Sequence, residues 1–251
     1  MIALALSLIL QQEKIAAPLP GYKLAWSDEF DYRGLPDPKR WDYEVGFVRN
    51  EEKQYYTKAR LENTMVNKGV LTITARQDGF EGHDVTSGSI HTNGKYDFKY
   101  GYVEVRAKIP TGKGTWPAIW MLGSNIGKVG WPLCGEIDIM ENVGHDPENV
   151  HFNIHAKGAN KGSHVTLPKV WEQFHTYGLE WTPTTLTWYF DGKPVLEFAK
   201  DGDDPAKWPF ADKQYLILNL AVGGNWGGQK GIDPSIYPAK YEVDYVRVFQ
   251  K

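Results

Sequence analysis

The chain has 251 residues, of which 28 are basic and 31 acidic, so its formal net charge is −3. This length fits one or two domains, and β-sandwiches of about 250 residues are commonly a single unit. The near-neutral charge, without clusters of Lys and Arg, excludes the electrostatic footprint of a nucleic-acid-binding protein. The single cysteine, Cys134, excludes an intramolecular disulfide, and we expect it to be a small buried residue.

The N-terminal segment from Met1 to Leu10 is uncharged and apolar. Its length matches the hydrophobic part of a secretory signal and is too short for a membrane span of about 20 residues. The alternative is an ordinary N-terminal strand, because no Lys or Arg precedes the run. We predict a leader over residues 1–20, a single domain over residues 21–251 with no membrane span, and a secreted, periplasmic or cell-surface protein.

The chain from residue 21 onward has mostly the period-2 pattern of β-strands. Apolar residues alternate with polar ones from Leu71 to Ala75 and again from Val103 to Ile109, as in half-buried antiparallel strands. The runs 186–190 and 194–198 flank Asp191-Gly192, which predicts a hairpin because this pair tolerates positive φ angles.

Two further β-rich runs follow, from Tyr215 to Val222 and from Tyr241 to Phe249. With 26 Gly and 15 Pro along the chain, no amphipathic helix longer than about two turns is expected, and the one helical candidate is Pro205 to Trp208. The sequence therefore predicts one all-β domain made of two packed sheets.

The run from Glu136 to Glu141, Glu-Ile-Asp-Ile-Met-Glu, is the most informative stretch. On a strand, Glu136 and Asp138 share one face, about 6.6 Å apart along the backbone. Strict alternation places Glu141 on the opposite, apolar face, whereas a β-bulge at Met140 returns it beside the other two acids. We therefore predict a bulge and three adjacent carboxylates whose pKa values are pushed apart.

Two carboxylates of different pKa are the equipment for glycoside hydrolysis, in which one attacks the anomeric carbon and the other protonates the departing oxygen. The alternatives are a solvated acidic edge and a calcium loop. Calcium loops place oxygen ligands on a flexible, glycine-bearing turn, whereas here isoleucines alternate with the acids on a strand.

Aromatic residues are interleaved with polar ones in three segments, as a glycan-binding surface requires. These segments, which we predict to be loops, are residues 50–56, 114–120 and 223–228. The last is glycine-rich but lacks the Lys-Ser/Thr ending of a phosphate cradle, and we expect no helix after it. We assign four other tryptophans to the core: Trp26, Trp41, Trp181 and Trp188.

His151 and His155 are four residues apart, which on a helix would suggest a zinc pair. Val150, Phe152 and Ile154 alternate with the polar residues, however, and this predicts a strand. Its polar face, being close in sequence to the three acids, is a candidate lining of a substrate cleft.

From these residues the sequence resembles glycoside hydrolase family 16, and within it the bacterial laminarinase-like endo-β-1,3-glucanases. The resemblance runs from Leu24-Ala-Trp-Ser-Asp-Glu-Phe30 to Val243-Asp-Tyr-Val-Arg-Val248. Its most specific motif is Glu136 to Glu141, supported by Trp116-Pro-Ala-Ile-Trp-Met-Leu122 and Gly223-Gly-Asn-Trp226. The resemblance implies a β-jelly roll, two curved antiparallel sheets with a glycan cleft along the concave face.

The resemblance also implies roles for individual residues. Glu136 would be the nucleophile, Glu141 the general acid/base, and Asp138 an auxiliary carboxylate. Positions matching substrate contacts of the family are Asn50, Arg76, Trp116, Trp120, His155, Asn225 and Trp226. No cofactor is required, but many relatives hold a structural calcium, and the matching positions are Glu29, Gly69 and Asp244.

The expected function is that of a monomeric, retaining endo-β-glucanase that cleaves β-1,3 bonds of laminarin-type glucan, with β-1,4 bonds of mixed-linkage glucan as a further substrate. Residues 156–162 depart from many laminarinases after His155, so the acceptor side is expected to differ. The alternatives are a galactan hydrolase of the agarase type and a non-catalytic β-glucan-binding module. Sulfated galactans call for a basic cleft, which a net charge of −3 does not favour.

Overall fold

The computed structural model describes residues 15–251, so the apolar run Met1 to Leu10 lies outside the described residues. Of the predicted leader, Ile15, Ala17 and Leu19 pack against a small apolar cluster that contains Tyr102 and Phe249. Within residues 15–251, no helix has the length and apolar character needed to cross a lipid bilayer.

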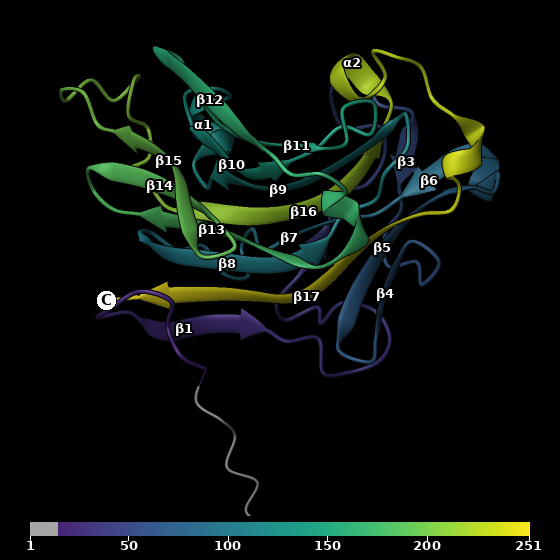
Figure 1. The fold of residues 1–251 in the computed structure, drawn as a ribbon, viewed down its shortest axis with the longest axis horizontal. Coiled ribbons are helices and arrows are strands. Elements are labelled where there is room, and N and C mark those ends of the chain that lie inside the picture. The colour runs from purple at the N-terminus through teal and green to yellow at the C-terminus, as the bar shows by residue number, and fades with distance from the viewer. Residues whose placement is uncertain (1–14) are drawn as a thin grey trace, which may run out of the picture.

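Two β-sheets lie face to face and make up most of the molecule (Figure 1). The larger sheet consists of β15 (Lys193–Ala199), β14 (Thr185–Phe190), β13 (His175–Trp181), β8 (Gly101–Lys108), β17 (Ala239–Gln250), β5 (Val70–Gln77), β6 (Val85–Ser87) and β3 (Gln54–Tyr56), with β1 (Lys23–Asp28) beside β17 and β4 (Thr64–Asn67) beside β5. The smaller sheet consists of β12 (Ala159–Thr166), β11 (Asn149–Ala156), β10 (Glu136–Glu141), β9 (Thr115–Gly123), β16 (Gln214–Val222), β7 (Ser89–His91) and β2 (Asp42–Tyr43). All pairings are antiparallel except that of β3 with β6, which confirms the predicted all-β sandwich.

The main core fills the space between the sheets, and strand alternation decides which side chains enter it. On β9, Ile119 and Met121 belong to this core, whereas Trp120 packs in a separate cluster on the other face of the sheet. Trp188 of β14 is buried in the core and donates its indole N–H to the carbonyl of Asp138 on β10, at 2.8 Å. This bond ties the larger sheet to the strand that carries the acids.

The predicted core tryptophans and hairpin are confirmed. Trp41, Trp181 and Trp188 are fully buried, and Trp26 is partly buried against the same core. The predicted hairpin forms from β14 and β15, with positive φ at both Asp191 and Gly192. Cys134 is buried and free.

The predicted helix at Pro205–Trp208 is wrong. These residues form a turn in which the amides of Lys207 and Trp208 donate to the carbonyl of Asp204. Pro209 follows directly, and a proline disfavours the helical conformation of the residue before it. Trp208 is instead buried, with its ring centroid 5.3 Å from that of Phe210.

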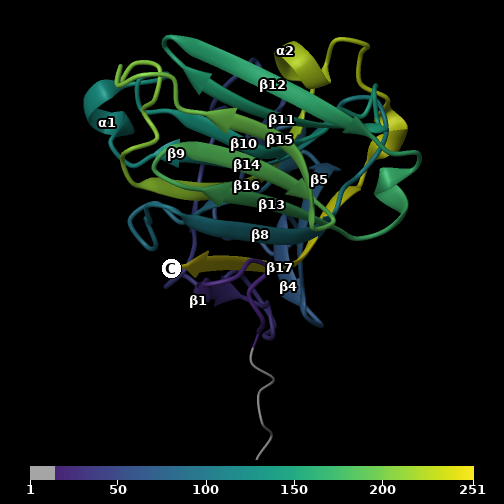
Figure 2. The ribbon, with the colours of Figure 1, turned by 60° about the vertical axis from the view of Figure 1, so that its left-hand side comes forward.

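The described helices are single turns: α1 (Ile126–Val129), α2 (Gly224–Gly227), and the 3-10 turns η1 (Phe80–Gly82), η2 (Val170–Glu172) and η3 (Pro234–Ile236). The glycine-rich segment thus contains a helical turn, α2, that we did not predict. Segment 114–120, predicted as a loop, lies almost wholly in β9 because its alternate residues enter the core. Helices α1 and α2 stand at opposite ends of the smaller sheet (Figure 2).

Candidate active site

The predicted bulge lies in β10, at the point where the three acids need it. Asp138 pairs with Trp120 of β9, but the next pair is Met140 with Ile119, so β10 carries one extra residue there. The register with β11 shifts over the same stretch. Ile139 and Met140 are both completely buried. The extra residue lets two consecutive side chains enter the core and returns Glu141 to the face of Glu136 and Asp138.

Glu136 lies at the start of β10, beneath the segment that follows α1. Its Oε2 accepts a hydrogen bond from the indole of Trp131 at 2.9 Å, and its Oε1 lies 3.5 Å from His155 Nε2. His155 lies on β11 directly opposite Glu136. Burial raises the pKa of Glu136, and three neighbours counteract that rise: His155, the Trp131 hydrogen bond and Arg49. This carboxyl therefore has the most support for a negative charge.

Asp138 occupies the middle of the acidic face and is almost completely buried, with 2% of its surface exposed. Its Oδ2 lies 3.4 Å from His155 Nε2. Burial, and after it the charge of Glu136, raise the pKa of Asp138 well above its usual range. Like charges this close resist simultaneous ionisation, so Glu136 and Asp138 together favour one negative charge over two.

Glu141 lies at the end of β10, beside the start of β9 and next to α2. Trp116 of β9 donates its indole N–H to Glu141 Oε1 at 3.0 Å. The ring of Trp226 in α2 packs edge-on against Trp116, at 5.5 Å between centroids. Burial and the charge of Asp138 raise the pKa of Glu141 well above its usual value, outweighing the Trp116 hydrogen bond. Glu141 therefore holds a proton at a pH at which an ordinary glutamate has lost it.

An open cleft of about 990 Å³ lies over this acidic face. The cleft is lined by Glu136, Asp138 and Glu141, together with the predicted contact residues Asn50, Trp116, Trp120, His155 and Trp226. His151 and Asn153, from the polar face of β11, also line it. The structure thus gathers the three acids and five of the seven predicted contact residues in one place.

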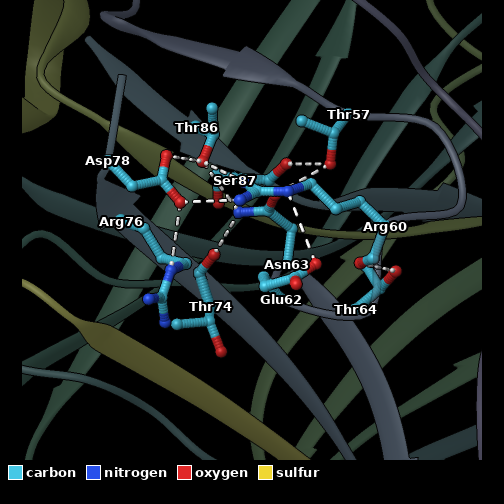
Figure 3. A network of polar contacts seen from close by, with 10 residues as sticks. All are labelled: Thr57, Arg60, Glu62, Asn63, Thr64, Thr74, Arg76, Asp78, Thr86 and Ser87. Atoms are coloured by element: carbon cyan, nitrogen blue, oxygen red, sulfur yellow. Dashed lines mark hydrogen bonds and ion pairs between the residues drawn. The ribbon is translucent and has the colours of Figure 1, made fainter. Parts of the chain in front are cut away.

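The structure does not bring Arg76 into this cleft. Arg76 lies on β5 of the larger sheet, where its Nε donates to Asp78 at 3.1 Å (Figure 3). The same carboxylate accepts from Arg60 at 2.9 Å. Asp78, two residues after Arg76 in the chain, thus holds the Arg76 guanidinium in a local polar network.

Asn225 also lies outside the main cleft. It belongs to α2, and its amide N–H donates to the carbonyl of Asn50 at 2.9 Å. Asn225 borders a smaller hollow that is also lined by Glu51, Lys53 and glycines of the 223–231 segment. In this structure Asn225 joins two loops at the cleft wall, whereas Trp226, the next residue, faces the cleft.

The residues proposed for calcium do not fit a cation site as they are arranged. Both oxygens of Glu29 accept from the guanidinium of Arg247, at 3.0 and 2.7 Å. Asp244 is paired with Arg106. Each carboxylate is thus neutralised by an arginine, and Gly69 adds no charge. In the described residues, the one group of three ligand-bearing side chains gathered within 4.8 Å is Glu136, Asp138 and His155.

The sequence reasoning did not single out several residues of the cleft lining, among them Trp131, Arg49 and Glu52. Trp131 contacts Glu136 and leaves 59% of its surface exposed. Arg49 lies over the ring of Trp120, at 4.8 Å from the centroid, and is paired with Glu44. Glu52 is buried and accepts from Gln54 at 2.7 Å. Glu52 lay within the aromatic segment 50–56, whereas no pattern pointed to Trp131.

The arrangement of Glu136 and Glu141 in the cleft meets the requirements of glycoside hydrolysis. One carboxylate is supported as an anion by an imidazole and an indole N–H, and a second on the same face is held protonated. Both border an open cleft whose tryptophan faces and amides suit the apolar and hydroxyl surfaces of sugars. A general acid and a nucleophile on either side of one glycosidic bond can cleave it without a cofactor.

The comparisons with known proteins agree with this chemistry. Residues 51–247 match the model of the glycosyl hydrolases family 16. A β-glucanase of Rhodothermus marinus is 47% identical over 92% of this chain and 86% of its own length.

Two solved structures are similar as well. The laminarinase of Rhodothermus marinus superposes with a TM-score of 0.88 at 46% identity, over 92% of this chain and 98% of that one. SCLam, a non-specific endo-β-1,3(4)-glucanase, gives 0.89 at 45% identity, over 94% of each chain. These matches confirm the predicted jelly roll. The chain is a glycoside hydrolase and belongs to family 16 of the glycosyl hydrolases.

Proposed function

We propose that this chain is an endo-acting, retaining β-glucanase that hydrolyses internal β-1,3 bonds of laminarin-type glucan, and also β-1,4 bonds in mixed-linkage glucan. The observation that carries the proposal is the pair Glu136 and Glu141 on one face of β10, with a stronger rise in pKa at Glu141. The substrate class is supported by the similar β-glucanase, laminarinase and SCLam proteins.

The first step forms a covalent intermediate. An oxygen of ionised Glu136 attacks the anomeric carbon, the bond from that carbon to the bridging oxygen breaks, and Glu141 transfers its proton to the departing oxygen. In the second step Glu141 removes a proton from water, and the water oxygen displaces Glu136 from the sugar. Two displacements at one carbon return the original β configuration.

The position of β10 in the smaller sheet supports cleavage within a chain. Strand order places β11 and β12 on one side of β10, and β9, β16, β7 and β2 on the other. The cleft lining runs from Ser163 and His164 on β12 across to Tyr215 and Asn219 on β16. Because the acids lie between the two ends of this lining, a bound glycan extends past them in both directions.

The lining also favours a neutral glycan. Four tryptophans, three asparagines and three histidines contribute to the lining, and its one arginine, Arg49, is paired with Glu44. A sulfated galactan would meet the three acids of β10 together with Glu44 and Glu52, with little compensating positive charge. A binding module without catalysis would have no use for the proton held on Glu141. Both alternatives are therefore weaker than a β-glucanase.

The test is the Glu136→Gln variant, assayed beside the wild type on laminarin, lichenan and agarose. We expect release of reducing sugar from the two glucans by the wild type and none by the variant, which should still bind laminarin. NMR of the first products should show the β-anomer. Normal turnover by the variant would refute the assignment of Glu136, and equal inactivity of the wild type on all three polymers would favour a binding module.

We further propose a monomer that is secreted, periplasmic or at the cell surface. The support for export is the apolar run Met1 to Leu10, outside the described residues. Mass spectrometry of the native protein would show whether residues 1–20 are removed. Size-exclusion chromatography would give the oligomeric state.

A further inference from the structure

Three aromatic side chains form a cluster beside the cleft, which we call the rim platform: Phe47, which is exposed, and Tyr55 and His83, which are half-buried. The rings of Tyr55 and His83 are stacked, 3.7 Å apart and inclined by 7°. Phe47 is nearly perpendicular to both, with centroids at 5.6 Å from each. Phe47 leaves 62% of its surface exposed, the largest fraction among the exposed large hydrophobic residues of the described chain.

The rim platform is held by backbone pairing. Gly46 and Tyr56 exchange two N–H to carbonyl hydrogen bonds of 3.0 Å, which fix the loop directly before Phe47. Tyr56 of β3 is completely buried. Because successive side chains of a strand point to opposite faces, the burial of Tyr56 directs Tyr55 outward, toward Phe47.

The third member, His83, is carried by the turn between β5 and β6, and the polar network of Figure 3 anchors that turn. Asp78 accepts from Arg60 at 2.9 Å and from Thr86 at 3.1 Å. The amide of Asp78 donates to the carbonyl of Asp84 and so closes the turn. Since β6 pairs with β3, with Tyr55 opposite Thr86, this network sets the position of His83 relative to Tyr55.

The rim platform is continuous with the catalytic cleft. Val48, Arg49 and Asn50, which follow Phe47 directly, line the cleft, and so does Glu52. Adjacent Cα atoms are 3.8 Å apart, so the backbone of Phe47 borders the lining at Val48. Flat apolar rings next to polar groups are the surface that neutral sugar rings bind.

We propose that the rim platform is an additional glycan-binding site, which holds a sugar ring of a neutral β-glucan chain after that chain leaves the cleft. The inference rests on the proposed function and extends it. The platform lies away from the acids, so it contributes to the binding of long chains and not to bond cleavage. It gives the enzyme a preference for polymer over short oligosaccharide.

The test compares two substrates and two variants. In Phe47→Ala we expect KM for laminarin to rise by roughly 3- to 10-fold, the range of a lost aromatic contact, with kcat unchanged. KM for a laminarin-derived tetrasaccharide should stay within about twofold of the wild type, because so short a chain is held by the cleft. Phe47→Trp, which retains an aromatic face, should restore the KM for laminarin.

The matched control is Leu24→Ala, which removes another exposed apolar side chain, on β1 of the larger sheet, and should leave both KM values unchanged. If Phe47→Ala changed KM equally for laminarin and the tetrasaccharide, or changed neither KM, the rim platform would not be a glycan-binding site. In a Glu136→Gln background, Phe47→Ala should also weaken retardation by laminarin in an affinity gel. A wild type that neither cleaves nor binds any glucan would instead refute the proposed function, and with it this inference.

Discussion

The two ends of β10 carry the same side chain in opposite electrostatic surroundings. At one end, Glu136 receives a hydrogen bond from Trp131 and has His155 and Arg49 nearby, all of which oppose the rise of its pKa. At the other end, Glu141 also receives an indole hydrogen bond, but its next largest influence after burial is the charge of Asp138, which raises its pKa. Neighbouring charge, more than the tryptophan contact, therefore distinguishes the two glutamates.

This difference shows how one strand can supply both a nucleophile and an acid. A residue's place on the strand selects its neighbours: Glu136 is opposite His155, whereas Glu141 is opposite His151. The Nε2 atom of His155 lies 3.5 Å from Glu136 Oε1 and 3.4 Å from Asp138 Oδ2. The Glu136 end of the site thus takes its histidine from β11, and the Glu141 end, which we call the tryptophan end, takes its tryptophans from β9 and α2.

After loss of the nucleophile Glu136, the largest expected effect comes from removing the acid at the tryptophan end. Glu141→Gln keeps the shape of the side chain but cannot donate a carboxylic proton, so kcat/KM on laminarin should fall by roughly 10²- to 10⁴-fold. An aryl β-glucoside whose leaving group needs no protonation should still form the glycosyl-enzyme quickly and show a burst of released phenol.

Glu136→Gln is the matched variant, because it should lose the burst as well as turnover. If Glu141→Gln were as inactive toward the activated glucoside as Glu136→Gln, the assignment of Glu141 as the acid would be wrong. Burst amplitudes from stopped-flow absorbance with both variants distinguish the two outcomes.

Much of this arrangement could be predicted from the sequence. Alternation within β5, β8 and β11 identified their core faces, and the odd spacing from Asp138 to Glu141 required a bulge if all three acids were to share a face. The structure has that bulge. These successes rest on local periodicity, which depends only on residues close together in the chain.

The rest depended on the three-dimensional path of the chain through turns, which the alternation of apolar and polar residues does not encode. Trp131 is brought to Glu136 by the path of the chain after α1, and no spacing in the sequence encodes that path. Arg76 matched a family position but is held by Asp78, a pairing that became visible only with the turn of Figure 3. The helix predicted at Pro205 failed because the burial of Trp208 among aromatic rings outweighed a weak local preference.

The second prediction concerns the hydrogen bond at the tryptophan end. Trp116→Phe removes the indole N–H that stabilises ionised Glu141, so the pKa of Glu141 should rise further. The base limb of the pH profile of kcat/KM, which reports loss of the acid's proton, should move to higher pH by about one unit, the equivalent of one hydrogen bond to a charged group. Trp171→Phe, which removes an indole remote from the cleft lining, should leave the profile unchanged. A base limb that moved to lower pH would contradict this role for Trp116.

The smallest expected effect lies at the opposite end of β10. Trp131→Phe removes the N–H that stabilises ionised Glu136, so the pKa of Glu136 should rise and the acid limb of the profile should move to higher pH. Because Trp131 is 59% exposed, water replaces much of the lost hydrogen bond, and we expect a shift of about half a unit or less. In the pH profile of kcat/KM for this variant, activity should fall on the acidic side and stay unchanged on the plateau.

The two tryptophan variants together test the assignment of the glutamates. Trp131→Phe should move the acid limb alone, and Trp116→Phe the base limb alone, since each indole donates to a different carboxylate. The exchange of these two outcomes would mean that Glu141 is the nucleophile and Glu136 the acid. Movement of both limbs in each variant would show that the three carboxylates titrate as one coupled group, so that the opposite surroundings of the two ends would not divide their roles.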